Sequence, residues 1–232
     1  MPVNRPLADV ADALIAVVLA PRCAACAIPL ESPTRGPVCA ACWAEVACVP
    51  RPLHDSSQSG AIDRSQSAGR YEGALRHIIH AFKYEGRRTL GVRLGAVMRQ
   101  AGSDLLSDAD CAVPVPLHPW RHVTRGFNQA ADLASRLELP VVHALWRTRA
   151  TAPQTGLTAI KRRHNVRGAF SLSPLLSHRR HHAMIVNRVV VLVDDVRTTG
   201  ATLDACAQVL KGAGAREIRA LTVAVAEAPE TT

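Results

Sequence analysis

The sequence is poor in aromatic residues and has no long apolar run. Phe, Trp and Tyr make up only 3% of the 232 residues, so few side chains are present on which the bases of single-stranded nucleic acid could stack. No segment reaches the ~18–20 apolar residues that span a bilayer. The apolar run 11–20 is short, has acids at its start and is followed by no convincing cleavage site, so we do not interpret it as a secretion signal. With 48% hydrophobic residues, the chain is expected to form a core. Because neither a membrane span nor a secretion signal is recognised, we expect a cytoplasmic protein.

The net charge is strongly positive. Lys and Arg exceed Asp and Glu by nine, and ten histidines are present as well. This balance favours anionic partners such as phosphates, nucleic acid or acidic surfaces. The net charge would be lower if four cysteines bound a metal as thiolates. The net charge alone therefore does not distinguish between these partners.

Four of the seven cysteines form two closely spaced pairs, Cys23 with Cys26 and Cys39 with Cys42. A gap of two residues lets both thiolates of a pair face one tetrahedral ion, and two pairs complete a closed site. The spacing therefore predicts a structural Zn²⁺ site. Disulfides and unrelated free thiols are the alternatives, and a reducing compartment disfavours disulfides. The other three cysteines stand alone and are interpreted as small buried residues.

Hydrophobic periodicity predicts that helices and strands alternate along the chain. Helices are expected over 7–20, 73–84, 90–98, 128–137 and 201–212, and strands over 110–115, 139–145, 188–193 and 216–226. The alternation predicts an α/β fold, in which helices cover both faces of a mostly parallel sheet. We expect three parts: an N-terminal helix and four-cysteine module over 1–50, a polar linker over 51–67, and the α/β domain over 68–232.

The segment 188–202 carries the clearest chemical signal. An apolar strand ends in two acids, and a turn rich in threonine and glycine then opens a helix. The N–H groups and dipole of a helix N-terminus favour a phosphate, while carboxylates accept hydrogen bonds from sugar hydroxyls. The pattern therefore predicts a sugar-phosphate site. The residues predicted to bind are Asp194, Asp195, Thr198, Thr199, Gly200, Ala201 and Thr202.

Two other interpretations of this segment remain open. The acids could be incidental at the end of a strand, with a threonine that only caps the helix. The acid pair could also chelate a divalent metal, although the adjacent turn is suited to anions.

Residues 190–202 resemble the phosphoribosyl pyrophosphate (PRPP) motif of type I phosphoribosyltransferases. The whole chain resembles the ComF family of competence proteins. This second likeness extends from the cysteine pairs through Ala81–Gly86, Val113–His118, Arg125–Gln129 and Arg162–Phe170. One departure is Arg197, because type I enzymes usually have an aliphatic residue there.

The resemblance implies a Rossmann-like type I phosphoribosyltransferase core with a mostly parallel sheet, preceded by a small zinc-ribbon-like module. PRPP, or a related sugar phosphate, would bind with Mg²⁺ at the carboxyl ends of the strands. A nucleophile would then displace pyrophosphate from C1′. By position, the residues implied to contact pyrophosphate or act in catalysis are Lys83, Arg121, Arg125, Lys161 and Arg163. Asn128 and Gln129 are expected to contact ligand or to cap the following helix.

The same pattern leaves the function open between three classes. One is a phosphoribosyltransferase acting on an acceptor that the sequence does not reveal. The alternative is a non-catalytic PRPP- or nucleotide-sensing module that handles single-stranded DNA, and a third is a structural partner of DNA-uptake machinery with a vestigial site. With few aromatic residues, any DNA binding through basic segments such as 179–182 is expected to be weak, sequence-independent and salt-sensitive.

Overall fold

The computed structural model describes residues 5–48, 53–54, 60–117, 126–148, 168–174 and 183–226. The chain divides into two compact units. The N-terminal unit comprises Met1–Pro50 and Glu72–Leu90, and the sheet unit comprises Arg51–Tyr71 and Gly91–Thr232. Each unit buries apolar side chains of its own, such as Trp43 and Phe82 in the first and Leu192 and Leu210 in the second.

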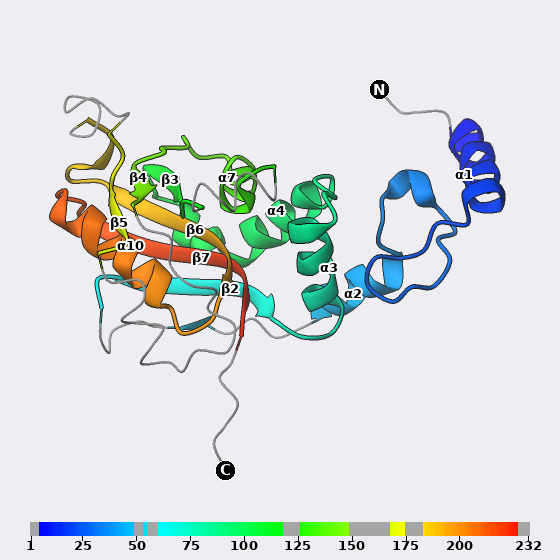
Figure 1. The fold of residues 1–232 in the computed structure, drawn as a ribbon, viewed down its shortest axis with the longest axis horizontal. Helices are drawn as coiled ribbons and strands as arrows, with labels where there is room; N and C mark the ends of the chain where they lie inside the picture. Colours follow the sequence, from blue (N-terminus) through cyan, green and yellow to red (C-terminus); the bar gives the residue numbers. More distant parts are fainter. Residues whose placement is uncertain are drawn as a thin grey trace, which may run out of the picture. The chain divides into compact units, whose positions relative to one another are not determined.

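A five-stranded sheet forms the centre of the sheet unit, with the strand order β1-β2-β7-β6-β3 (Figure 1). The strands are β1 (Leu53–His54), β2 (Arg64–Arg70), β3 (Cys111–Pro114), β6 (Val189–Arg197) and β7 (Glu217–Val225). Only β1 runs antiparallel to its neighbour, and the other pairs are parallel. The mostly parallel sheet expected from the sequence is confirmed.

Strand β2 begins within the predicted linker, which ends at residue 67, and extends into the predicted α/β domain. Its composition is polar, but Ser65 and Ser67 are buried against the sheet. The hydroxyl oxygens of Ser67 and Thr222 are 2.7 Å apart, so these polar groups satisfy each other inside the sheet. Small hydroxyl residues fit a crowded interior but lack the apolar alternation that identifies a strand, and this is why β2 was missed.

Helices cover both faces of this sheet, as Figure 1 shows. α10 (Ala201–Gly212) packs on one face through Leu203, Cys206, Ala207 and Leu210. α4 (Leu90–Ala101), α5 (Ser103–Leu106) and α7 (Gln129–Ala134) lie over the other face. The apolar positions of α10 recur at helical spacing, and its bounds match those predicted from the sequence.

The strand expected over 139–145 is wrong in extent. Val141 makes only an isolated parallel bridge to Ala112, beside β3. The regular strand is β4 (Leu145–Arg147), which pairs antiparallel with β5 (Phe170–Leu172) in a separate two-stranded sheet. The run contains Pro140, which has no N–H to donate, and this weakens it as a central strand.

The N-terminal unit contains α1 (Arg5–Leu19), the 3₁₀ turn η1 (Pro33–Arg35), α2 (Ala40–Cys48) and α3 (Gly73–Tyr84). The buried carboxylate of Asp12 in α1 accepts a hydrogen bond of 2.7 Å from the backbone N–H of Thr34. Glu45 of α2 likewise accepts one of 3.0 Å from the N–H of Ala74 in α3. Within the described part of the chain, no helix combines the length and apolarity needed to cross a membrane.

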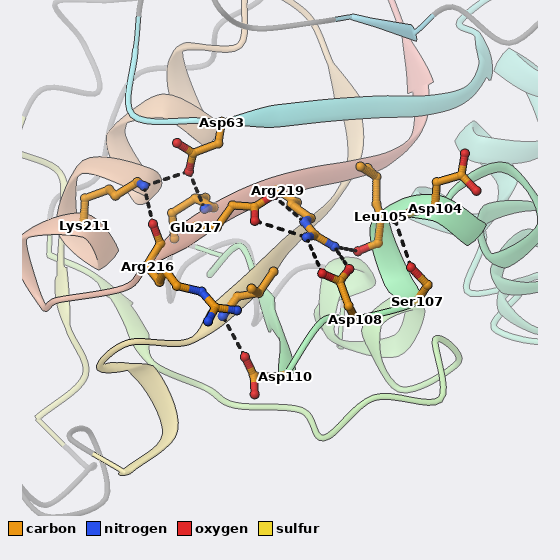
Figure 2. A network of polar contacts seen from close by, with 12 residues as sticks. Asp63, Asp104, Leu105, Ser107, Asp108, Asp110, Lys211, Arg216, Glu217 and Arg219 are labelled. Carbon is orange, nitrogen blue, oxygen red and sulfur yellow. Dashed lines mark hydrogen bonds and ion pairs between the residues drawn. The ribbon is translucent and has the colours of Figure 1, made fainter.

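A buried arginine joins several elements near the amino ends of the sheet strands (Figure 2). The side chain of Arg219 in β7 is almost fully buried. Its five N–H groups reach both carboxylate oxygens of Asp108, both of Glu217 and the carbonyl of Leu105. Because every donor of the guanidinium has an acceptor, this charge is fully compensated and connects β7 to the α5 region.

The contact with Arg219 predicts an acid-dependent part of the stability. Hydrogen bonds from this arginine lower the pKa of Asp108 from 3.8 to about 2. A lowered folded-state pKa gives stability that is present above about pH 4 and is lost as the pH falls toward 2. We expect Asp108→Asn to reduce the loss of thermal stability over this window, measured by thermal unfolding at stepwise pH. Asp104→Asn, at a nearby exposed site, should leave the profile unchanged, and an unchanged Asp108→Asn profile would contradict the prediction.

Candidate functional site

Strand β6 carries the predicted acids to the carboxyl edge of the sheet. Val189–Val193 are fully buried between β7 and β3. The strand continues through Asp194 and Asp195 to Arg197, four residues beyond the end expected from the sequence. Pairing with β7 extends to the last residue, with Arg197 opposite Val225. The acids are therefore held in regular backbone rather than at a frayed strand end.

The two acids differ in their surroundings. Successive strand residues point to opposite faces, so the carboxylates diverge. Asp194 lies on the α10 face, where its charge adds to burial in raising the pKa of Cys206. Asp195 is 9% exposed, whereas Asp194 is only partly buried. The N–H of Asp195 donates to Oδ1 of Asp194 at 2.8 Å. Asp194 is thus the more accessible acid.

A tight turn over 198–200 connects β6 to α10. Gly200 has φ 73° and ψ −4°, a left-handed conformation that costs a glycine little. The N–H of Ala201 lies 3.5 Å from the hydroxyl of Thr199. A left-handed residue next to helical ones lets successive N–H groups converge, and the first N–H groups of α10 have no helical acceptor. The turn and Ala201–Thr202 therefore offer backbone donors that suit an anion.

The end of β3 lies at the same edge. The N–H of Val115 donates to the carbonyl of Val193, one residue before the acids. The side chain of Asn128 donates to the carbonyl of Val115 at 3.1 Å and accepts from the N–H of Ala130 at 3.0 Å. Asn128 therefore caps α7, one of its two expected roles. The segment predicted to bind pyrophosphate leaves the sheet beside the acids.

The described structure does not test the other predicted ligand-binding residues. Lys83 is partly buried in the last turn of α3 and belongs to the N-terminal unit. The remaining four lie outside the described residues: Arg121, Arg125, Lys161 and Arg163. Their roles, and that of Lys83, stay predictions.

The sequence analysis identified Arg197 as a departure from the type I motif but assigned it no contact. Its Nη1 donates to the hydroxyl of Ser65 on β2 at 2.6 Å. A side chain at Gly200 would meet the same guanidinium, because a Cβ there would lie 3.3 Å from Nε of Arg197. Burial lowers the pKa of Arg197. The contact with Ser65 could not be foreseen, because β2 itself was not recognised.

The four paired cysteines come together in the N-terminal unit. Their sulfur atoms all lie within 4.8 Å of one another. Sγ of Cys23 is 3.9 Å from that of Cys42, and Sγ of Cys26 is 3.8 Å from that of Cys39. Thiolates about 2.3 Å from one tetrahedral ion such as zinc would lie about 3.8 Å apart. The cluster therefore fits a single four-coordinate metal ion.

The backbone around the cluster favours a thiolate at Cys23. Burial by itself raises the pKa of this thiol, but backbone N–H groups of Cys26, Cys39 and Ala25 outweigh it and bring the pKa from 9.0 to about 6. The N–H groups of Ala25 and Cys39 each lie 3.4 Å from its sulfur. Burial instead raises the pKa of Cys42. Three of the four cysteines, Cys23, Cys26 and Cys39, precede α2, and Cys42 lies in its first turn.

Comparison with known proteins assigns the family. The model of the phosphoribosyl transferase domain matches residues 123–232. "Competence protein F" of Haemophilus influenzae is 34% identical over 173 residues, which cover 70% of this chain and 72% of that protein. The chain belongs to the ComF family. "DNA utilization protein YhgH" of Escherichia coli K12 is 34% identical over 64% of this chain and 66% of its own length.

ComF-family membership and the mostly parallel sheet confirm the fold class expected from the sequence: a phosphoribosyltransferase-like core preceded by a four-cysteine module. Among solved structures, a hypoxanthine phosphoribosyltransferase from Staphylococcus aureus is similar to 60% of this chain and 75% of that chain. The identity is 13% and the TM-score 0.32. A structural similarity this weak is not used to assign the family. The assignment rests on the sequence comparisons.

Proposed function

We propose that this ComF-family protein binds PRPP with Mg²⁺ and transfers its phosphoribosyl group to an acceptor, releasing pyrophosphate. The observation that carries the proposal is the arrangement of β6, the 198–200 turn and α10. Acids that accept hydrogen bonds precede a turn that offers N–H donors at the carboxyl edge of a parallel sheet. Ligands of open α/β sheets bind at this edge.

Each part of the ligand has a proposed contact. The 5-phosphate lies in the 198–202 turn, held by backbone N–H groups and by the hydroxyls of Thr198, Thr199 and Thr202. Asp194 and Asp195 accept hydrogen bonds from the ribose hydroxyls, with Asp194 the more accessible of the two. The pyrophosphate lies toward the segment that follows β3.

In the transfer step the acceptor attacks C1′ as the bond from C1′ to the pyrophosphate oxygen breaks. The leaving pyrophosphate takes the bonding electron pair, and positive charge develops on the ribose ring. When bound, Mg²⁺ would neutralise part of the pyrophosphate charge. Arg125, Lys161 and Arg163 are proposed to stabilise the leaving group, with Lys83 and Arg121 as further cations, because fixed cations stabilise charge that develops in a transition state.

Binding of the sugar phosphate tests this assignment first. We expect Asp194→Asn to weaken binding of ribose 5-phosphate, and of PRPP with Mg²⁺, by roughly 1–3 kcal/mol, the scale of a lost charge-assisted hydrogen bond. Asp195→Asn should cost less, because Asp195 is nearly covered. Calorimetry on the full chain provides the measurement, with Asp104→Asn as the exposed-acid control. Equal affinities in the wild type and both β6 variants would rule out the ribose contacts.

Pyrophosphate release separates an enzyme from a binding module. Radiolabelled PRPP is incubated with a panel of bases, amines and nucleic acids. Release that depends on one acceptor supports transfer. Tight PRPP binding without release for any acceptor supports the alternative, a non-catalytic PRPP- or nucleotide-sensing module.

A role in DNA handling is the second candidate, supported by the names of the relatives and by the surface of α3. There Arg76, His77, His80 and Tyr84 are exposed, and the rings of His80 and Tyr84 lie 4.8 Å apart. Cations beside exposed rings suit stacked bases.

We expect binding of single-stranded DNA that Tyr84→Ala weakens and that is lost by ~0.5 M salt, measured by fluorescence anisotropy. Binding that survives this salt would contradict an electrostatic mode.

We further propose that the four-cysteine cluster holds a structural Zn²⁺, since four thiolates leave no position for substrate. Metal analysis should find one zinc per chain, and Cys42→Ser should lose it while Cys111→Ala retains it. Chelation should shift the emission of Trp43, which is buried in this unit. The sheet unit should stay folded, because it has its own core. Protein without zinc and with four freely titratable thiols would contradict the site.

A further inference from the structure

Positively charged side chains at the two edges of the sheet differ in whether they contact a carboxylate. Near the amino ends of the strands, three cations have carboxylate partners. Arg219 contacts Asp108 and Glu217, Arg188 contacts Asp110 at 2.9 Å, and Lys211 contacts Asp63 at 2.7 Å. Figure 2 shows Arg219 and Lys211 directed at these acids. These three charges are compensated within the protein.

At the carboxyl edge the situation of Arg197 is different. Among the described residues, the one hydrogen bond of its guanidinium goes to a neutral hydroxyl, that of Ser65. No carboxylate among the described residues forms an ion pair with it, and burial is the one influence that shifts its pKa, downward. A partly buried cation without a counter-ion is unfavourable unless an anion compensates it.

The guanidinium also lies against the phosphate turn. It occupies the side of Gly200 where a side chain would project, and a Cβ there would be 3.3 Å from Nε and 3.7 Å from Nη2. The hydroxyl of Ser65 on β2 accepts a hydrogen bond from Nη1 and so orients the other end of the guanidinium. The charge is thus fixed within a few ångströms of the N–H groups of the turn.

We propose that Arg197 is a specificity-determining residue that adds a fixed positive charge to the turn and selects a dianionic phosphate over a singly charged group. This inference rests on the proposed sugar-phosphate site. Ser65 acts as the positioning residue for Arg197. Without a cation at position 197, the turn would have only N–H and hydroxyl donors, and it would bind the phosphate end of the ligand less strongly.

The test compares two ligands that differ in charge, ribose 5-phosphate and ribose 5-sulfate, by calorimetry on the full chain at pH 8. Arg197→Met should weaken ribose 5-phosphate about tenfold, the scale of one charge-assisted interaction. It should weaken the sulfate ester less, because a single negative charge gains less from the guanidinium. Arg197→Lys should recover part of the loss, and Ser65→Ala should show a smaller loss with the same preference.

Arg216→Met is the matched control, because it removes an exposed charge at the opposite edge of the sheet and should change neither affinity. Thermal unfolding of each variant verifies that it is folded, and if Arg197→Met unfolds, the lysine and Ser65→Ala variants decide the question. Equal losses for both ligands, or no loss, would overturn the role of Arg197 while leaving the site in place. A wild-type chain that binds neither ligand would overturn the proposed site and this inference together.

Discussion

Strand β6 has a parallel partner on each side, β7 and β3, and its residues Val189–Val193 are buried in the middle of the sheet. A slip of this strand by one residue toward its amino end would draw the carboxylate of Asp194 into the apolar interior, which is costly for a charged group. The register therefore fixes the level at which Asp194, Asp195 and the following turn emerge. Everything proposed about ligand binding depends on this placement, because the donors of the turn are backbone atoms.

The sheet separates two kinds of polar chemistry. Near its amino ends, Arg219 is surrounded by acceptors that match all five of its donors, which suits a structural contact between β7 and the α5 region. At its carboxyl edge, the helix N-terminus and Arg197 present positive potential that is less completely matched by the described residues. Polar groups that satisfy one another stabilise the fold, and those left to a ligand are available for function.

Local signals in the sequence predicted those features that a few adjacent residues determine. The spacing of Cys23, Cys26, Cys39 and Cys42 predicted their cluster. The apolar run before Asp194 predicted β6, and the helical periodicity of 201–212 predicted α10. Features that depend on distant partners were not predicted. Strand β2 is identified as a strand by its pairing with β7 and β1, since its buried positions are serines, alanine and glycine. The contacts of Arg219 with Asp108, and of Arg197 with Ser65, join residues more than 100 positions apart.

The most direct test follows the backbone N–H groups themselves. Ribose 5-phosphate is titrated into ¹⁵N-labelled protein while the amide resonances are recorded by NMR. If the turn binds the phosphate, the largest shifts fall on the amides of 198–202, with smaller ones on Asp194 and Asp195, and Arg216 at the opposite edge stays unchanged. Shifts that leave 198–202 unaffected while other residues respond would show that the phosphate binds elsewhere, and would contradict the site at the end of β6.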